Sequence, residues 1–352
     1  MDTMISAKAY GVESQGSSFK PMKIERRDVL DDDVAIQILY CGICHSDVHQ
    51  VRNDWGGSNY PIVPGHEIVG RITKVGKNAG QFKEGDYVGV GCMVDSCGKC
   101  QSCNNGFEQQ CENETVWTYN SSDPHTNGLT FGGYSDKITV NKRFVIKINT
   151  SENLAGIAPI LCAGVTTYSP LKKFGAGPGK QVAVAGLGGL GHMAVKLAKA
   201  MGSEVTVFTT SEKKAEDAHK LGAHRTIVYK NKDDIRKSGL SFNIIIDTIP
   251  AEHDINALIS TLKPNGAMVL VGLPEKSTRY SLSPSILMDS NRSLAGSNIG
   301  GIPETQEVID FCVKHNIRSE IELINFPYLD EAYKRIMKND VRYRFVIDNS
   351  SL

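Results

Sequence analysis

The stretch that decides the fold runs from Gln181 to Met201 and reads QVAVAGLGGLGHMAVKLAKAM. Its first five residues form an apolar run that predicts a buried strand, and a glycine-rich turn follows directly. After the turn, apolar residues recur at the spacing of one helix face: Leu190, Met193, Ala194, Leu197, Ala198 and Met201. A strand, a turn and a helix in this order predict the start of a β-α-β unit.

The turn GLGGLG has the pattern G-x-G-x-x-G. Alone this pattern is weak, but here it follows a strand and opens a helix, as a dinucleotide-binding turn does. Gly186 would allow the tight turn, Gly188 would let the backbone approach a pyrophosphate, and Gly191 would let helix and strand pack closely. Free N–H groups at the helix start would bind the phosphates. This context argues against a flexible loop before an ordinary helix.

The end of the next strand distinguishes the two nicotinamide dinucleotides. An NAD-binding unit places Asp or Glu about 20 residues on, to bind the ribose 2′-hydroxyl. This chain has VFTTSEKK there, with three hydroxyls and two ammonium groups: Thr209, Thr210, Ser211, Lys213 and Lys214. Such groups accept a 2′-phosphate, which an acid would repel, so NADP(H) is predicted. Glu212 speaks against this unless its side chain points away, and Ser211 is also a suitable helix cap.

Strands and helices continue to alternate through this region. Val205–Phe208, Phe242–Thr248 and Ala267–Leu273 are expected as strands, with a break at Pro264–Gly266 before the last. This alternation predicts a doubly wound parallel sheet of the Rossmann type.

The chain before residue 151 has a different character. Short apolar runs such as Val34–Tyr40 alternate with Gly and Pro turns, which predicts a compact, barrel-like β domain. With 352 residues the chain is long enough for two domains. We expect residues 1–153 and 292–352 to form the β-rich domain, and residues 154–291 to form the dinucleotide domain.

Four cysteines lie close together in CGKCQSCNNGFEQQC, with the spacing C-x2-C-x2-C-x7-C: Cys97, Cys100, Cys103 and Cys111. Four thiolates in a short loop suit a tetrahedral structural zinc ion, and Gly98 and Gly106 would provide the turns. An iron–sulfur cluster is an alternative, but the spacing does not fit ferredoxin-type runs. Four free surface thiols would leave the spacing unexplained.

A second set of metal-ligand residues is scattered along the chain. CGICHSDVH contributes Cys44, PGHE contributes His66 and Glu67, and LCAGVTTY contributes Cys162. Each alone is more often a core residue than a ligand. Together they contain two Cys and one His, which is a documented ligand set for a catalytic zinc ion with one open position.

The motifs CHSDVH, GHE, the four-cysteine loop, LCAG, GLGGLG and GSNIGG resemble those of the zinc-dependent medium-chain alcohol dehydrogenases. The sequences of these motifs, and their order along essentially the whole chain, are similar to those of the cinnamyl-alcohol-dehydrogenase-like branch. The resemblance implies a GroES-like catalytic domain beside the Rossmann domain, and an NADP-dependent alcohol dehydrogenase or aldehyde reductase that forms a homodimer through its cofactor domains.

The resemblance also implies roles for single residues. Cys44, His66 and Cys162 would hold the catalytic zinc ion, with Glu67 beside it as a transient ligand, and the four loop cysteines would hold the structural one. Asp47 would accept a hydrogen bond from His66. In catalysis the zinc ion would polarise the substrate carbonyl, and protons would pass through Ser46 and His49. The residues expected to line the cofactor are His45, Thr166, Gly186, Leu187, Gly188, Gly189, Leu190, Gly191, Thr209, Thr210, Ser211, Lys214, Thr248, Gly272, Ser297, Asn298 and Ile299.

The resemblance places Trp117 and Asn298 at the substrate pocket, and Trp55 is expected to join them. Aromatic walls suit flat aromatic or allylic aldehydes. Lignin-forming plant members usually carry Phe where this chain has Asn298, and Leu where it has Trp55. A broad-range aldehyde reductase, acting on aromatic, allylic or aliphatic aldehydes and primary alcohols, is therefore preferred to a lignin-specific enzyme.

Composition excludes some other functions. Lys+Arg and Asp+Glu both number 39, so no basic surplus would attract nucleic acid or anionic lipid, and a zinc-ribbon nucleic-acid binder is disfavoured. No apolar run reaches the roughly 18 residues of a membrane span, and no signal pattern opens the chain. A cytoplasmic location, where the nine cysteines would stay reduced, is expected. A zinc-dependent polyol or sugar dehydrogenase and a non-catalytic NADP-binding protein stay as alternatives.

Overall fold

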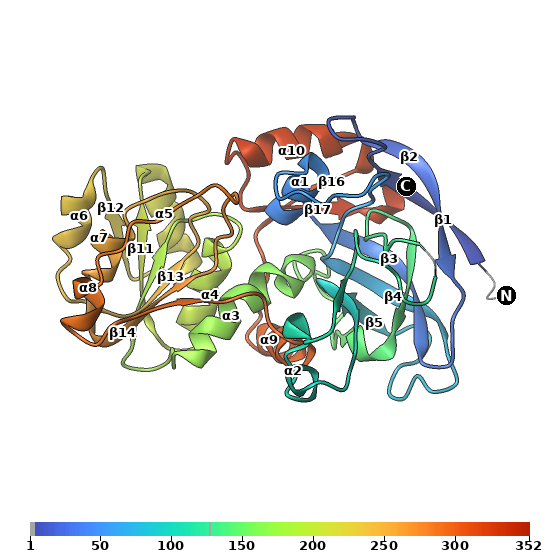
Figure 1. Ribbon diagram of the computed structural model, residues 1–352, viewed down its shortest axis with the longest axis horizontal. Coiled ribbons are helices and arrows are strands. Elements are labelled where there is room, and N and C mark those ends of the chain that lie inside the picture. Colours follow the sequence, from blue (N-terminus) through green and yellow to red (C-terminus); the bar gives the residue numbers. More distant parts are fainter. Residues whose placement is uncertain (1–3, 127) are drawn as a thin grey trace. The chain divides into compact units, whose positions relative to one another are not determined.

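The computed structural model describes residues 4–126 and 128–352. The chain divides into two compact units, one formed by the residues up to Cys162 together with Gly300–Leu352, the other by Ala163–Ile299 (Figure 1). The boundaries predicted from the sequence follow residues 153 and 291. Residues 154–162 instead lie with the first unit, and residues 292–299 with the second.

The second unit contains a fully parallel sheet of six strands in the order β12-β11-β10-β13-β14-β15. The strands are β10 (Gln181–Ala185), β11 (Glu204–Thr209), β12 (Arg225–Val228), β13 (Phe242–Asp247), β14 (Leu262–Leu270) and β15 (Ser293–Gly296). In order along the chain this is 3-2-1-4-5-6, the arrangement of a doubly wound Rossmann sheet. The predicted fold class of this part is therefore confirmed.

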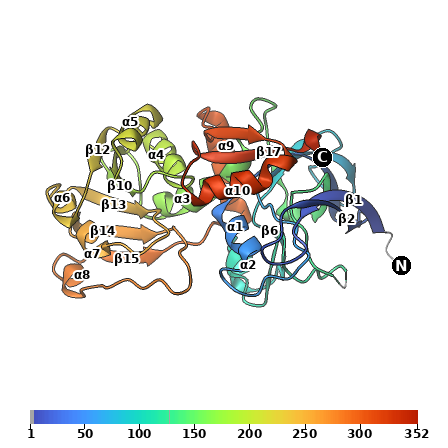
Figure 2. The same cartoon turned by 90° about the horizontal axis from the view of Figure 1, so that it is seen from above.

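Helices cover both faces of this sheet, as Figure 2 shows. On one face lie α3 (Ala163–Lys173), α4 (Gly191–Ala200) and α5 (Glu212–Leu221), and on the other α7 (Ile255–Ile259) and α8 (Ser285–Met288); the short α6 (Lys232–Arg236) follows β12. The strand order reverses between β10 and β13, and ligands of such sheets bind at the carboxyl ends of the strands at this point. The glycine-rich turn follows β10 there, and Thr248 follows β13.

Strand β14 begins earlier than the sequence predicts. Pro264–Gly266 was expected to break the chain before the strand, yet β14 starts at Leu262. Leu262 is fully buried and pairs with Phe242, after which the register shifts so that Ile244 pairs with Ala267. The Pro-Asn-Gly segment is accommodated as a bulge, with Asn265 in the left-handed region at φ 62°.

The first unit is built on a mixed sheet in the order β16-β17-β3-β4-β5-β9, with β8 also pairing with β3. Its strands are β3 (Asp33–Gly42), β4 (Ile68–Val75), β5 (Tyr87–Val90), β8 (Lys137–Asn141), β9 (Ile146–Lys147), β16 (Ile321–Ile324) and β17 (Arg344–Asp348). Two ribbons add to it: β1 (Met4–Gly11) with β2 (Lys20–Arg27), and β6 (Met93–Ser96) with β7 (Thr115–Trp117). The expected β-rich character of this part is confirmed.

The helices of the first unit are α1 (His45–Arg52), α2 (Gln101–Asn104), α9 (Ile302–Lys314) and α10 (Leu329–Met337). Among the residues that the structure describes, no helix of either unit has the length and apolar character that crossing a membrane requires.

The core of the second unit gives a test of its packing. Phe208 on β11 is fully buried, and its ring lies 5.5 Å from that of Phe242 at a steep angle. Phe208→Ala should lower the stability of this unit by about 3–5 kcal/mol, because it removes a large buried side chain and leaves a cavity. Leu240→Ala is the matched control, since Leu240 is 56% exposed, and should change stability by less than about 0.5 kcal/mol. Hydrogen exchange of the β10–β14 amides would measure the stability change in both variants. Equal changes in Phe208→Ala and Leu240→Ala would contradict the packing described.

Candidate active site

Four of the predicted metal-ligand residues come together in the first unit. The ligand atoms of Cys44, His66, Glu67 and Cys162 all lie within 4.8 Å of one another, and all four residues are buried. We call these four residues the buried metal group. The pairing of β3 with β4 explains their proximity, because the end of β3 meets the start of β4, where the amide of Gly42 donates to the carbonyl of Glu67 at 2.9 Å. Cys162 follows a short 3-10 turn, Ala158–Leu161.

The two sulfur atoms fit a shared metal ion. The Sγ atoms of Cys44 and Cys162 are 4.0 Å apart, close to the roughly 3.8 Å that two thiolates at about 2.3 Å from a tetrahedral zinc ion would show. A hydrogen bond from Cys162 lowers the pKa of Cys44 well below its usual value, and the same contact raises the pKa of Cys162. One thiolate therefore disfavours the second, and a divalent cation would supply the positive charge that both need.

Asp47 orients the histidine of this group. Its Oδ1 lies 3.0 Å from Nδ1 of His66 and also accepts the Gly65 amide at 3.1 Å, while its Oδ2 accepts the Cys44 amide at 2.8 Å. With Nδ1 donating to the carboxylate, Nε2 of His66 keeps a lone pair for a metal. Burial lowers the pKa of His66, but the charge and hydrogen bond of Asp47 together with Cys92 and Cys44 outweigh burial, and the pKa lies well above its usual value.

A buried ion pair between Glu67 and Arg344 completes the surroundings of the metal group, and Arg344 was not predicted. Arg344 on β17 donates through Nη2 to Oε1 of Glu67; the side chains are 5% and 0% exposed. The other carboxylate oxygen, Oε2, has no hydrogen-bond partner among the described residues and is an open acceptor. Burial raises the pKa of Glu67 to about 7, although Arg344 acts in the opposite direction. The signal for Arg344 was a lone charge opening an apolar strand, RFVI.

The predicted proton-relay residues lie on or beside α1. Ser46 Oγ is 3.6 Å from Cys44 Sγ, which places its hydroxyl at the metal group. His49 is held by Asp54, whose Oδ2 is 2.9 Å from Nδ1, and its ring centre lies 4.9 Å from that of Trp55. Asp54 was not predicted, although an acid five residues after a candidate relay histidine was a usable signal.

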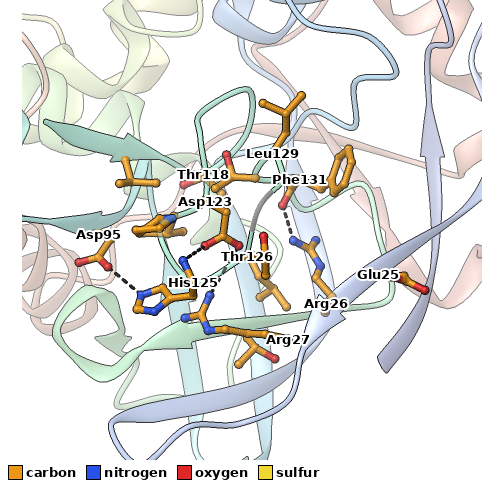
Figure 3. Close-up of a pocket in the computed structure, with 16 residues that line it drawn as sticks. Glu25, Arg26, Arg27, Asp95, Thr118, Asp123, His125, Thr126, Leu129 and Phe131 are labelled. Atoms are coloured by element: carbon orange, nitrogen blue, oxygen red, sulfur yellow. Dashed lines mark hydrogen bonds and ion pairs between the residues drawn. The ribbon is translucent and has the colours of Figure 1, made fainter. Parts of the chain in front are cut away.

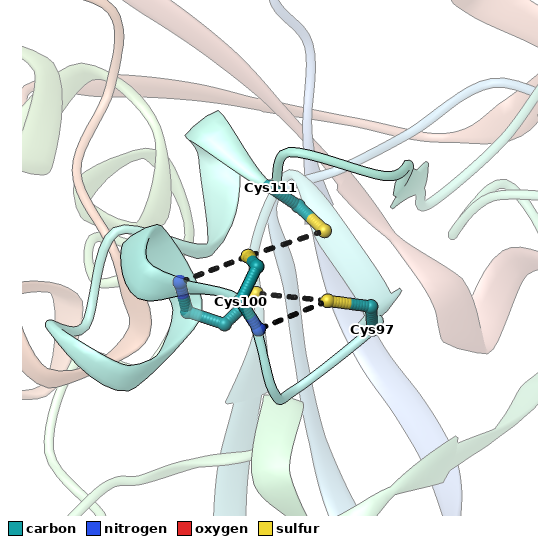
Figure 4. Close-up of side chains that lie close together, drawn as sticks. Cys97, Cys100 and Cys111 are labelled. Carbon is teal, nitrogen blue, oxygen red and sulfur yellow. Dashed lines mark hydrogen bonds between the residues drawn. The ribbon is translucent and has the colours of Figure 1, made fainter.

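The cysteine loop also brings its four thiols together, and Figure 4 shows Cys97, Cys100 and Cys111 of this group. The sulfur atoms lie within 4.8 Å of one another, with Cys97 and Cys103 3.9 Å apart and Cys100 and Cys111 4.0 Å apart. Backbone amides donate to these sulfur atoms: the amide of Cys100 to Cys97, and the amides of Cys103 and Glu112 to Cys100. The Lys99 amide is the main cause that lowers the pKa of Cys97 to about 6. The donor set and its spacing fit a tetrahedral zinc ion.

The glycine-rich turn has room for a ligand at one of its three predicted glycines. A Cβ at Gly191 would lie 2.2 Å from the carbonyl oxygen of Gly186, so the helix packs closely on the turn. Gly186 itself has φ 87°, which favours glycine. A Cβ at Gly188 would meet no atom within 4 Å, as expected where a ligand approaches the backbone. Leu187, Gly189 and Leu190 lie in the same turn.

The residues expected to select the cofactor follow β11. Thr209 is the last residue of β11 and is buried, and its Oγ1 accepts the Ser211 amide at 3.3 Å. Thr210 is exposed. Ser211 caps α5 by accepting the Lys214 amide at 3.4 Å, so its role as a cap is observed. Glu212 is exposed.

Other predicted cofactor and substrate residues are spread over both units. Near the glycine-rich turn, Thr248 Oγ1 donates to the carbonyl of Ala185 at 2.8 Å, and a Cβ at Gly272 would lie 2.7 Å from the Thr248 backbone. Thr166 is buried within α3, and Ser297, Asn298 and Ile299 follow β15 in the second unit. His45 starts α1 in the first unit, where Trp55 is half-buried and Trp117 is 38% exposed on β7.

A small polar cavity of about 40 Å³ lies elsewhere in the first unit (Figure 3). There His125 lies 3.0 Å from Asp95, the backbone amide of His125 donates to Asp123, and Arg26 donates to the Phe131 carbonyl. Its lining contains none of the predicted site residues, and its volume suits a few water molecules at most. It is not a candidate active site.

Comparison with known proteins defines the class. Residues 30–150 match the model of the alcohol dehydrogenase GroES-like domain, and residues 189–314 match that of the zinc-binding dehydrogenases. The chain belongs to the zinc-binding alcohol dehydrogenase family, as its motifs predicted.

Individual relatives indicate to which branch of this family the chain is similar. Aldehyde reductase YahK of Escherichia coli is 50% identical over 98% of this chain and 99% of its own length. NADP-dependent alcohol dehydrogenase C 1 of Mycolicibacterium smegmatis is 49% identical, over 99% of each chain. Among solved structures, the cinnamyl alcohol dehydrogenase of Helicobacter pylori complexed with NADP(H) has a TM-score of 0.93 and 42% identity, over 99% of each chain. The predicted cinnamyl-alcohol-dehydrogenase-like branch is confirmed.

The two cysteine sites should respond differently to substitution. Cys44→Ser and Cys100→Ser should each lower the zinc content of the purified chain from two ions to one. Cys44→Ser should abolish turnover with the fold kept, because its neighbours are held by β3, β4 and Asp47. Cys100→Ser should lower the melting temperature more, because the short loop from Cys97 to Cys111 has little core of its own. Metal analysis would measure the zinc content, and thermal melting and an activity assay would compare the two variants. Lost turnover in Cys100→Ser together with the larger drop in melting temperature in Cys44→Ser would show that the two sites are wrongly assigned.

The buried ion pair allows a double-mutant test. Arg344→Met should destabilise the first unit by about 3–5 kcal/mol, because it leaves the Glu67 carboxylate buried without its charged partner. The double variant Glu67→Gln/Arg344→Met should recover most of this loss, since no charge is then left unpaired. Urea unfolding would give the free energy of unfolding of each variant. If the double variant lost as much stability as Arg344→Met and Glu67→Gln lose separately when added together, the two side chains would not stabilise each other.

Proposed function

We propose that the protein is a zinc-dependent, NADP(H)-dependent alcohol dehydrogenase that acts as a broad-range aldehyde reductase. The observation that carries the proposal is the buried metal group, in which two cysteines and an Asp-held histidine converge beside the open acceptor Oε2 of Glu67. A zinc ion bound there would act as a Lewis acid towards the substrate oxygen. NADPH would supply the hydride.

The chain's own residues prepare this site. Asp47 fixes the ring of His66 and, through the Cys44 amide, the start of α1. Arg344 holds Glu67 by one oxygen, which leaves the other free to approach the metal position. Ser46 lies beside Cys44, and we assign to its hydroxyl the exchange of a proton with a substrate oxygen. We assign the next proton transfer to His49, which Asp54 orients.

We assign dinucleotide binding to the unit Ala163–Ile299 and catalysis to the other unit. The glycine-rich turn at the strand-order reversal supports the first assignment. Selection of the 2′-phosphate falls to Thr210, Ser211 and Lys214 at the start of α5. The Cys44 site would carry the catalytic zinc ion and the cysteine loop a structural one.

The substrate class follows from the pocket residues expected from the family. Trp55 and Trp117 offer flat apolar surface, and Asn298 is smaller and more polar than an aromatic residue. We therefore infer a tolerant site for aromatic, allylic and aliphatic aldehydes. A cytoplasmic location is proposed because nine cysteines without a disulfide suit a reducing compartment.

A homodimer through the dinucleotide unit is also proposed. Strand β15 forms one edge of its sheet, so a second copy of the strand has free backbone groups to pair with.

The proposal is tested by the oxidation of NADPH, and in parallel NADH, in the presence of cinnamaldehyde, benzaldehyde and butanal. Rapid oxidation of NADPH and slow oxidation of NADH are expected. Lys214→Ala should raise the KM for NADPH about tenfold and leave the KM for NADH unchanged, because it removes one charged contact to the phosphate. Lys220→Ala, exposed in the last turn of the same helix, is the control. Oxidation of polyols such as mannitol with NADP⁺, without aldehyde reduction, would refute the proposed substrate class.

A further inference from the structure

A histidine–aspartate pair lies in the dinucleotide unit, apart from both cysteine sites. Asp247 is the last residue of β13 and is 1% exposed. His253 lies in the loop between β13 and α7, with its side chain 14% exposed. Its Nε2 is 3.0 Å from Oδ2 of Asp247. Neither the motifs nor the proposed chemistry uses this pair.

The geometry favours the charged form of the imidazole. Nδ1 of His253 is 2.8 Å from the carbonyl oxygen of Ala251, which can only accept, so Nδ1 carries a proton. A neutral ring would then turn a lone pair of Nε2 towards the Asp247 carboxylate, whereas an imidazolium turns a positive N–H to that side. The Nε2 contact is an ion pair rather than a well-aligned hydrogen bond. Burial lowers the pKa of His253, but Asp247, the Ala251 carbonyl and Asp254 together outweigh burial and raise the pKa above its usual value.

The pair is connected to the glycine-rich turn through two neighbouring residues. Oδ1 of Asp247 accepts the Ile249 amide at 3.1 Å, and its backbone carbonyl accepts the amides of Val271 and Gly272. A Cβ at Gly186 would lie 2.9 Å from Thr248 Oγ1 and 3.2 Å from Ile249 Cγ1, so these two side chains form a wall beside the turn. The orientation of Asp247 therefore sets the position of that wall.

Several other groups surround the pair. Asp254, which caps α7, also raises the pKa of His253, and Glu252 adjoins it in the chain. The ring of Tyr280 meets the imidazole edge-on at 5.3 Å, and Tyr229 is close enough for Asp247 to raise its pKa further, beyond the effect of burial. Among the residues that the structure describes, His253 is the one cation in ion-pair contact with Asp247. Loss of its proton would leave a buried carboxylate without positive charge beside it.

We infer that His253 is a positioning residue for dinucleotide binding: its imidazolium holds Asp247 and thereby the Thr248–Ile249 wall, so that affinity falls as His253 loses its proton. This inference rests on the proposed binding of NADP(H) at the glycine-rich turn. The sign follows from linkage. Because the protonated form is the binding form, affinity is greatest below the pKa of His253 in the free protein and declines as pH rises through it.

The test is the Kd of the zinc-loaded full chain for NADPH, measured by NADPH fluorescence between pH 6 and pH 9. Three proteins are compared: the unaltered chain, His253→Gln, and His315→Gln as control, since His315 is exposed at the end of α9 in the other unit. At pH 6 His253→Gln should bind about fivefold more weakly than the unaltered chain, the scale of one ion pair. The gap should close towards pH 9, and His315→Gln should follow the unaltered chain throughout. Changes in the ligand's own ionisation cancel in these ratios.

A second measurement covers the case in which His253→Gln does not fold. An NMR titration of the His253 ring in the unaltered chain should show its pKa rising when NADPH is bound. Parallel Kd profiles for His253→Gln and the unaltered chain, or an NMR pKa that NADPH leaves unchanged, would overturn this inference alone. Absence of NADPH binding by the unaltered chain at every pH would overturn the proposed function together with it.

Discussion

The structure of the first unit depends on one constraint: charged groups that are buried away from water must be paired with opposite charge. Cys44, Cys162, Asp47, Glu67 and Arg344 are all buried there around His66, and each would be costly if left charged and unpaired. Arg344 offsets Glu67, and backbone amides and the imidazole offset Asp47. The two sulfur atoms lie 4.0 Å apart and their contact disfavours a second thiolate, which is why this group suits a divalent cation.

The sheet makes that arrangement possible. Antiparallel pairing joins β3 to both β4 and β17, so that the Cys44 segment, the His66–Glu67 segment and Arg344 are all carried by neighbouring strands or by their ends. Rigid elements hold ligands more precisely than loops do. The cysteine loop is the opposite case, since there the metal ligands themselves and the amides around them hold a segment with little regular structure.

The dinucleotide unit obeys a different constraint. Its parallel strands all end at the same edge of the sheet, and the reversal of order between β10 and β13 opens that edge beside the glycine-rich turn. The segment after β13 then forms one side of the turn through Thr248 and Ile249. A buried carboxylate at the end of that strand needs a counter-charge, and His253 provides it at the cost of making the segment sensitive to protonation.

Local patterns in the sequence determined a large part of this protein. The run QVAVA gave β10 with its observed limits, GLGGLG marked the turn, and the spacing of four cysteines marked one metal site, because each of these signals is complete within a few residues. Tertiary structure decided what depends on distant segments. It placed Arg344 against Glu67, 277 positions apart, and absorbed Pro264–Gly266 into β14 through the burial of Leu262. Pairing across strands and burial in a shared core create these contacts, and neither is written in the spacing of nearby residues.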